Sequence, residues 1–315
     1  MNQAQAARRI LGLDERQIAL VLLFVAPALF AANMLVARAT ADAIPPVALA
    51  FWRWTVALIV LAPFTAGALW RQRWAVRHEW RDLLVLGTLG MGVCGAFVYI
   101  GADTTTATNI GLIYAAAPIL IVVLTRTVYG EALGPVQAFG VALSLAGVIA
   151  VVCRGDIAVL LSIGFAAGDI WILGAAAGWA LYATLLRHRP STLPPTARFA
   201  AIIAGGILVL APFAVAEGVG GALPVLDWTT VAAVMTVAML PSLGAYQAYA
   251  RAQTVLGAGP ASLVMYLIPI YNGVLAFLLL GEALEAYHLV GAALVLPGIY
   301  LATRSAPRKQ PPLVT

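Results

Sequence analysis

Ten apolar segments long enough to cross a membrane take up most of this sequence. A helix needs about 20 apolar residues to span the hydrocarbon core of a bilayer. Only 10% of the 315 residues are charged, against about 25% in a soluble domain, so the chain cannot cover a water-facing surface. We therefore expect an integral membrane protein. The ten predicted helices are residues 18–37, 47–69, 83–102, 109–125, 135–153, 168–186, 195–216, 231–250, 260–280 and 286–303.

The basic residues orient these helices. Cytoplasmic loops of membrane proteins are enriched in Lys and Arg. With the N-terminus inside the cell, fifteen of the eighteen basic residues fall on the cytoplasmic side, while Arg38 and Arg154 fall outside and Arg53 lies within the second helix. The sequence therefore predicts that both termini are cytoplasmic. Because the chain has a single lysine and no basic surface with interleaved aromatic residues, we expect no nucleic-acid partner.

An internal repeat relates the two halves of the chain. The tetrapeptide Gly-Glu-Ala-Leu occurs at 130–133 and again at 281–284, an offset of 151. Upstream, an offset of 149 aligns the Pro-Pro pair at 45–46 with the pair at 194–195. Each half then holds five helices, and because five is odd, the second half crosses the membrane in the opposite sense.

The predicted fold is therefore an all-α membrane protein of ten transmembrane helices, arranged as two inverted-topology five-helix repeats. The first repeat is residues 1–155 and the second is residues 156–315. Inverted repeats are typical of secondary transporters, whose substrate site lies near the midplane between the halves. Channels and membrane enzymes with repeats are the competing classes.

Arg53 is the one basic residue deep within a predicted helix. Ionisable groups in a bilayer are costly and usually face the interior of the bundle. Arg53 could bind the carboxylate of an anionic or zwitterionic substrate. It could equally be a structural arginine that caps carbonyl groups or pairs with an acid near the outer face.

Aromatic and amide side chains, rather than carboxylates, occupy the middle of the predicted helices. Proton and sodium antiporters usually place an acid near the midplane, so the sequence disfavours strong ion coupling. A mostly apolar cavity with a few hydroxyl and amide groups suits small organic solutes, although ordinary helix packing is the alternative for each residue. The candidate substrate-binding residues are Asn33, Tyr99, Tyr114, Trp179, Tyr182, Tyr246, Gln247 and Tyr266, with Asn272 nearby.

Two further pairs are candidate hinge or structural residues. Pro118 and Pro269 occupy equivalent positions in the fourth and ninth helices, where we expect kinks or hinges. Glu131 and Glu282, from the repeated tetrapeptide, fall on opposite faces of the membrane and cannot form one site. We expect each at a turn, with the glycine ending one helix and the acid near the positive N-terminal end of the next.

Together these features resemble the EamA-type ten-helix branch of the drug/metabolite transporter superfamily. The resemblance covers essentially the whole chain. It is carried by the repeated Gly-Glu-Ala-Leu with its upstream proline, Phe-Trp-Arg at 51–53, Ala-Gly-Trp-Ala-Leu-Tyr at 177–182, and Tyr-x-x-Ala-x-Thr at 99–104, echoed at 249–254. Within the family, the pattern is most similar to the YddG-type inner-membrane exporters of aromatic and other neutral amino acids.

The resemblance implies a basket-like bundle with a central cavity lined by helices one, three, four, six, eight and nine. It also implies outward movement of amino acids and of xenobiotics. The first helix departs from the family pattern, because Phe30-Ala-Ala-Asn33 stands where the family often has Trp-Gly-Ser/Ala-Asn. Asn33 is kept, whereas the aromatic wall on that side lacks its tryptophan.

The predicted function is export of small metabolites, above all aromatic and other neutral amino acids, across a bacterial inner membrane by alternating access. Efflux of hydrophobic cationic drugs is an alternative that would favour a buried acid. A membrane enzyme is another, but His78, His188 and His288 lack partners at useful spacing. A non-catalytic scaffold or sensor is a fourth, although such short loops leave little surface for partners.

We expect no cofactor and no bound metal. The chain has no GxxxxGK[ST] motif for ATP. Its two cysteines, Cys94 and Cys153, lie in apolar segments and are expected to be buried thiols. The expected partners are the small-molecule substrate and the lipid bilayer, with no protein partner required.

Overall fold

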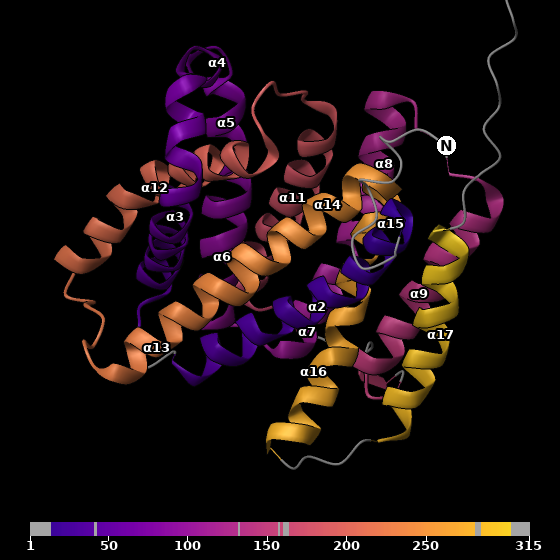
Figure 1. The fold of residues 1–315 in the computed structure, drawn as a ribbon. Coiled ribbons are helices and arrows are strands. Elements are labelled where there is room, and N and C mark those ends of the chain that lie inside the picture. Colours follow the sequence, from indigo (N-terminus) through magenta and orange to yellow (C-terminus); the bar gives the residue numbers. More distant parts are fainter. Residues whose placement is uncertain are drawn as a thin grey trace, which may run out of the picture.

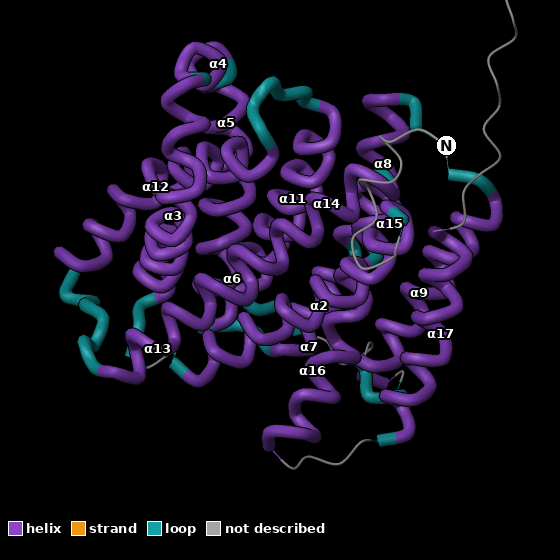
Figure 2. Tube along the Cα trace, in the orientation of Figure 1, coloured by secondary structure: helices purple, strands orange, loops and turns teal. Residues whose placement is uncertain are grey.

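The computed structural model describes residues 14–40, 43–131, 133–156, 158–159, 164–280 and 285–303. Within these ranges the chain forms helices and turns without strands, and ten helices are long and apolar enough to cross a membrane (Figure 1 and Figure 2). Each predicted segment overlaps one of the ten. The prediction of an all-α protein with ten transmembrane helices is confirmed.

Several of the spans are composed of more than one helical element. The third and eighth spans each contain a π-helical segment, named η, and the fourth and ninth are each broken into two α-helices. In chain order the elements are α2 (Glu15–Ala39), α3 (Pro46–Arg71), α4 (Arg73–His78), α5 (Trp80–Gly87), η1 (Thr88–Val93), α6 (Cys94–Ala102), α7 (Ala107–Ala115), α8 (Ala117–Tyr129), α9 (Pro135–Val152), α11 (Ala167–His188), α12 (Pro195–Val219), α13 (Trp228–Val237), η2 (Ala238–Ala245), α14 (Tyr246–Leu256), α15 (Ala258–Ser262), α16 (Val264–Leu280) and α17 (Ala286–Thr303).

Local sequence signals set the helix ends. The Asp14 carboxylate accepts a hydrogen bond of 2.7 Å from the Gln17 backbone N–H, so α2 begins before its apolar segment does. Proline takes the first position of α3, α9 and α12, where no backbone N–H is needed. Helix α8 ends at Gly130, whose φ of 70° lies in the left-handed region that favours glycine.

Two helix pairs form the lateral sides of the bundle (Figure 1). Helix α3 packs along α12 on one side and α9 packs along α17 on the other. Helices α2, α7, α14 and α16 lie between the two pairs. Each lateral pair joins helices that occupy equivalent positions in the two predicted repeats.

Four glycines make the contact between α9 and α17. A Cβ atom on Gly140 would lie 2.5 Å from the Gly298 carbonyl oxygen, and one on Gly147 would lie 2.8 Å from the Gly291 carbonyl oxygen. The two helix backbones therefore touch, as small residues allow in membrane proteins. The sequence repeat aligns Gly140 with Gly291 and Gly147 with Gly298. Each glycine thus packs on the counterpart of the other, which is the contact pattern that a two-fold relation between helices produces.

The two π-helical segments end directly before residues of the central region. η1 is followed by Cys94 and η2 by Tyr246. A π-turn misaligns backbone carbonyls, and such turns often occur at functional sites. The Tyr246 hydroxyl donates a hydrogen bond of 2.9 Å to the Gly90 carbonyl within η1. The π-segment of the first half is therefore stabilised by a side chain from the second half.

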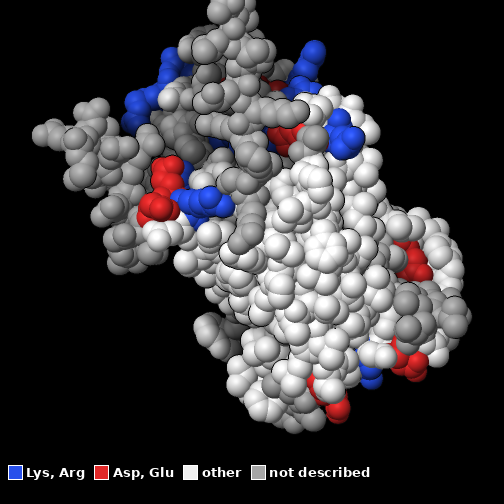
Figure 3. Space-filling model, turned by 90° about the vertical axis from the view of Figure 1, so that its right-hand side faces the viewer, with Lys and Arg blue, Asp and Glu red and all other residues white. Residues whose placement is uncertain are grey.

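Charged side chains gather toward the two ends of the bundle, with a broad uncharged surface between them (Figure 3). We call the end that carries α4 the α4 end. There, ion pairs join Arg189 to Asp82 at 2.9 Å and Arg251 to Glu15 at 3.3 Å. The cytoplasmic location of this end stays a prediction from the basic residues.

Glu79 connects the two halves of the chain at the α4 end. Its carboxylate accepts hydrogen bonds from the Ser191 hydroxyl at 2.5 Å and from the Thr192 backbone N–H and hydroxyl, both at 2.9 Å. Burial by itself raises the pKa of this carboxyl. The hydrogen bonds from Ser191 and Thr192 outweigh that effect, so the pKa of Glu79 lies below its usual value.

Glu79→Gln is expected to weaken the acid sensitivity of the fold. A carboxyl with a lowered folded-state pKa stabilises the protein above its unfolded-state pKa of about 4.3 and loses that contribution as the pH falls through the folded-state pKa. The melting temperature of the wild type in detergent should therefore fall more steeply than that of Glu79→Gln below about pH 4.3. Glu15→Gln, which removes a carboxyl of a surface ion pair, is the control. Equal slopes for wild type and Glu79→Gln would contradict the expectation.

Candidate functional site

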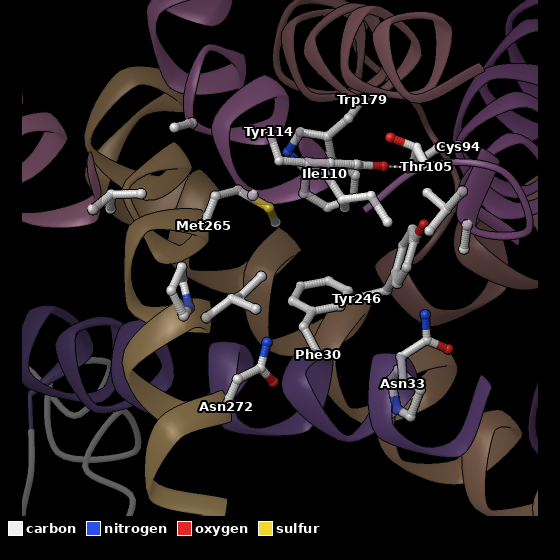
Figure 4. A pocket seen from close by; sticks show the side chains of 18 of the residues that line it. Phe30, Asn33, Cys94, Thr105, Ile110, Tyr114, Trp179, Tyr246, Met265 and Asn272 are labelled. Atoms are coloured by element: carbon white, nitrogen blue, oxygen red, sulfur yellow. Dashed lines mark hydrogen bonds between the residues drawn. The ribbon is translucent and has the colours of Figure 1, made fainter. Parts of the chain in front are cut away.

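A cavity of about 240 Å³ lies between the two halves of the bundle (Figure 4). The six helices implied by the family resemblance all contribute to its wall, and α3 and α9 add one residue each. The lining residues are Phe30, Asn33, Arg53, Cys94, Val98, Ala102, Thr105, Ile110, Gly111, Tyr114, Ala115, Val148, Trp179, Pro241, Tyr246, Met265, Ile268, Pro269 and Asn272.

Half of the predicted binding residues line this cavity. Asn33 comes from α2, Tyr114 from α7, Trp179 from α11 and Tyr246 from α14. Figure 4 shows the amides of Asn33 and Asn272 on the side of the cavity opposite Tyr114. Side chains far apart in the sequence therefore meet around one space.

The other four predicted binding residues lie outside the wall of the cavity. Tyr99 is buried beside it and contacts Arg53. Tyr182 packs behind Trp179, with ring centroids 5.7 Å apart, and Tyr266 donates a hydrogen bond of 3.1 Å to the Ala115 carbonyl.

Gln247 is turned away from the cavity. It lines a separate shallow groove between α2 and η2–α14, together with Leu22, Val25 and Met239. Its neighbour in the chain, Tyr246, faces the cavity.

Arg53 is held in place by a triangle of hydrogen bonds. Its Nη1 donates to Asn33 Oδ1 at 3.0 Å and to the Tyr99 hydroxyl at 2.6 Å, and that hydroxyl donates to Asn33 Oδ1 at 2.6 Å. The guanidinium carbon lies 4.8 Å from the Trp54 ring centroid and 5.5 Å from that of Tyr99, close enough for cation–π attraction. These contacts fix the direction of a side chain that is only 3% exposed.

The positive charge of Arg53 has no carboxylate partner among the described residues. The described arginine–carboxylate ion pairs all lie at the α4 end. The reading of Arg53 as the partner of an acid near the outer face therefore finds no support in the described part of the chain. A buried charge is normally paired, so the cavity wall is suited to a ligand that brings a negative charge.

Aromatic rings form the wall next to Arg53. Phe30 meets Trp179 edge to face with centroids 5.6 Å apart, and Trp179 meets Tyr246 in the same way at 5.5 Å. Tyr246 in turn contacts the Trp54 ring at 5.0 Å. Phe30 thus supplies an aromatic surface where the family often has tryptophan.

The cavity is closed on the side that faces the α4 end. Tyr182 and Tyr249 are fully buried there, and Gln253 donates a hydrogen bond of 2.7 Å to the Ala183 carbonyl. In the other direction the lining reaches Ala102 and Thr105, where α6 ends.

A buried acid lies beside this second boundary of the cavity. The Asp169 carboxylate accepts hydrogen bonds from the Thr105 hydroxyl, from Asn109 Nδ2 at 2.9 Å and from the Ala166 backbone N–H at 2.9 Å. Thr105 thus joins the cavity wall to the start of α11. With three donors, Asp169 is fully engaged in holding this end of the bundle together.

The two predicted hinge prolines have different surroundings. The fourth span breaks at Ala116, directly before Pro118 in the first turn of α8. Pro269 lies inside the continuous helix α16 and lines the cavity. The ninth span breaks instead at Leu263, between α15 and α16.

Glu131 contacts a histidine rather than the start of the next helix. Helix α9 begins only at Pro135, and Glu131 Oε1 lies 3.1 Å from His188 Nε2 at the end of α11. The acid therefore joins the ends of α8 and α11 across the α4 end. Glu282, its counterpart in the repeat, lies outside the described residues.

Several lining residues carried no signal that sequence reasoning used. Cys94, Thr105 and Met265 line the cavity, yet each is a common residue in an apolar helix or a turn. The position of Cys94 directly after a glycine-rich π-segment is the one local feature that could have marked it.

Comparisons with known proteins agree with this architecture. The profile of the EamA-like transporter family matches residues 17–153 and again residues 166–304. A protein of Archaeoglobus fulgidus named as an uncharacterised transporter is 29% identical over 82% of this chain and 88% of its own length. The uncharacterised transporter YyaM of Bacillus subtilis is 24% identical over 85% of this chain and 87% of its own length.

One solved crystal structure shares the fold. It aligns with a TM-score of 0.69 over 90% of this chain and 96% of its own, at 21% identity, a likeness that concerns the fold alone. The family match covers most of the chain, in two segments of similar length. The chain therefore belongs to the EamA-like transporter family and is a multi-pass membrane transporter of small molecules.

Proposed function

We propose that this transporter exports aromatic and other neutral amino acids across a bacterial inner membrane. The single observation that carries the proposal is Arg53, a buried guanidinium on the cavity wall without a carboxylate partner among the described residues. Guanidinium binds carboxylates through two parallel hydrogen bonds, and all amino acids present a carboxylate.

The remaining wall accounts for the rest of an amino acid. The rings of Phe30, Trp179 and Tyr246 offer apolar faces for an aromatic or aliphatic side chain and π-faces for an ammonium group. A volume of about 240 Å³ is below the usual range for drug-sized ligands, which favours a small metabolite. A hydrophobic cation would meet the charge of Arg53 and no carboxylate of a described lining residue, which argues against cationic drug efflux.

The proposed mechanism is alternating access between two inverted repeats, residues 1–155 and 156–315. Substrate would bind to Arg53, Asn33, Tyr114, Trp179 and Tyr246 at the middle of the bundle. Tyr182, Tyr249, Gln253 and Tyr266 would separate when the cavity opens toward the α4 end. Asp169 and its donors would separate when it opens the other way.

Counterflow in proteoliposomes tests the proposal. Liposomes containing purified protein and unlabelled phenylalanine should accumulate radiolabelled phenylalanine, tryptophan or leucine faster than empty liposomes. A panel of neutral amino acids, amines without a carboxylate and quaternary ammonium drugs defines the substrate class. The proposal fails if no amino acid in the panel exchanges above the level of empty liposomes.

Labelling of Cys94 is expected to report occupancy of the cavity. Cys94 lines the cavity, with its Sγ 3.8 Å from the Tyr114 hydroxyl, whereas Cys153 is 2% exposed at the end of α9. In a Cys153→Ser background, a small membrane-impermeant methanethiosulfonate added from the periplasmic side should modify Cys94, and saturating substrate should slow the reaction severalfold. Cys94→Ser is the control for background labelling. An unchanged rate with a substrate that exchanges in counterflow would place that substrate elsewhere.

A further inference from the structure

The region around the cavity holds more free hydrogen-bond donors than acceptors. Arg53 Nε, Trp179 Nε1 and Trp54 Nε1 are buried and have no hydrogen-bond partner among the described residues. The three side chains are 3%, 2% and 0% exposed. Buried polar groups are ordinarily bonded, so three unbonded N–H groups around one space require an explanation.

Two of these side chains converge on a bare point of α6. A Cβ atom placed on Gly95 would lie 3.3 Å from Trp54 Nε1 and 3.9 Å from Arg53 Nη2, with no other residue's atoms recorded within 4 Å. The absence of a side chain at Gly95 therefore leaves room for an atom-sized ligand. That ligand would be contacted by an indole N–H and a guanidinium N–H.

The surrounding charge is complementary to an anion. The other nitrogen of the Arg53 fork, Nη1, is occupied by Asn33 and Tyr99, so Nε and Nη2 are the groups that remain for a ligand. No described carboxylate lies within ion-pair distance of the guanidinium; the described salt bridges join other residues at the α4 end. Desolvated charge without a partner is costly in a membrane, and a small anion would neutralise it.

We propose that a monovalent inorganic anion, of which chloride is the abundant example, binds over Gly95 between Arg53 and Trp54. The anion occupies the site when no substrate carboxylate is present, and a carboxylate displaces it by taking the same N–H donors. Displacement rests on the proposed function, whereas binding of the anion does not. Transport then becomes an exchange at Arg53 in which the guanidinium is never left without a negative partner.

Thermal melting of the purified protein tests the site directly. Chloride should raise the melting temperature of the wild type saturably when it replaces gluconate at constant ionic strength. Gly95→Ala fills the space with a methyl group and keeps Arg53, so it should lose the chloride response. Gly92→Ala is the matched control, since its nearest neighbour would be a Val209 methyl at 3.8 Å. The absence of a chloride response in the wild type, or an equal response in Gly95→Ala, overturns the proposal.

Counterflow separates this inference from the proposed function. Chloride should slow amino-acid counterflow severalfold at low substrate, and the inhibition should disappear at saturating substrate. Amino-acid exchange that is unaffected by chloride would remove the anion site and leave the proposed function standing. Chloride-dependent melting without exchange of any amino acid would do the reverse.

Discussion

Arg53→Gln is expected to abolish most amino-acid counterflow while the protein still folds. Removing one partner of a buried, hydrogen-bonded charge pair costs about 2–5 kcal/mol. At about 1.4 kcal/mol per factor of ten, the loss corresponds to roughly 30-fold or more in transport at low substrate. Glutamine keeps a polar side chain of similar length that can still bond to Asn33 or Tyr99, so the network in the bundle is largely retained. Initial counterflow rates at equal amounts of reconstituted protein measure the effect.

Two controls separate the charge of Arg53 from its shape and from general effects. Arg53→Lys keeps the charge but loses the planar fork that binds a carboxylate through two bonds, so its activity should lie between those of wild type and Arg53→Gln. Arg126→Gln removes an exposed arginine of α8 far from the cavity lining and should leave transport unchanged. Wild-type rates in a folded Arg53→Gln would show that Arg53 does not hold the substrate.

The ten membrane helices were predictable because the bilayer imposes a simple rule on the chain. Length and the absence of charge are sufficient to find a span. Their exact ends depend on local caps, such as Asp14, which starts α2 at Glu15 rather than at residue 18. The composite spans were not predictable, since no residue in Thr88–Val93 or Ala238–Ala245 identifies a π-segment.

The depth of the site was predictable, but the direction of each side chain was not. Tyr246 and Gln247 lie at the same depth of the eighth span, yet one residue along a helix rotates a side chain by about 100°. Tyr246 consequently faces the cavity and Gln247 faces a groove elsewhere. The π-segment η2 directly upstream shifts the helical phase further, so extending the normal period from α13 would misplace both residues.

The arrangement around Arg53 depends on contacts between distant parts of the chain. Asn33 and Tyr99 were candidates for the substrate site, and both also bond to Arg53. A single sequence contains no signal for the pairing of residues on α2, α3 and α6. For the same reason, Glu131 was predicted to interact with α9, whereas its contact is with His188 on α11.

Gly298→Leu is expected to separate α9 from α17 and destabilise the fold strongly. A Cβ atom at Gly298 would lie 2.3 Å from Ser144 Oγ and 2.7 Å from the Gly140 carbonyl oxygen. Neither helix can yield to a leucine without breaking the glycine contacts along the whole pair. Overpacking a close contact costs about 3 kcal/mol at the upper end of its usual range, and this contact involves backbone rather than a flexible side chain. The melting temperature in detergent and the yield of monodisperse protein should both fall.

Gly67→Leu is the matched control for this prediction. Gly67 is exposed on α3, and a Cβ atom there would meet only Arg71 Nη1, at the ordinary contact distance of 3.5 Å. Leucine is also a better helix former than glycine by close to 1 kcal/mol, so this variant should melt at or above the wild-type temperature. The reciprocal contact makes a second demand: Gly147→Leu, against the Gly291 carbonyl, should be destabilised as strongly as Gly298→Leu. A stable Gly147→Leu beside an unstable Gly298→Leu would mean that the two ends of the α9–α17 contact are not equivalent, and the two-fold relation between these helices would be lost as an explanation of the repeat.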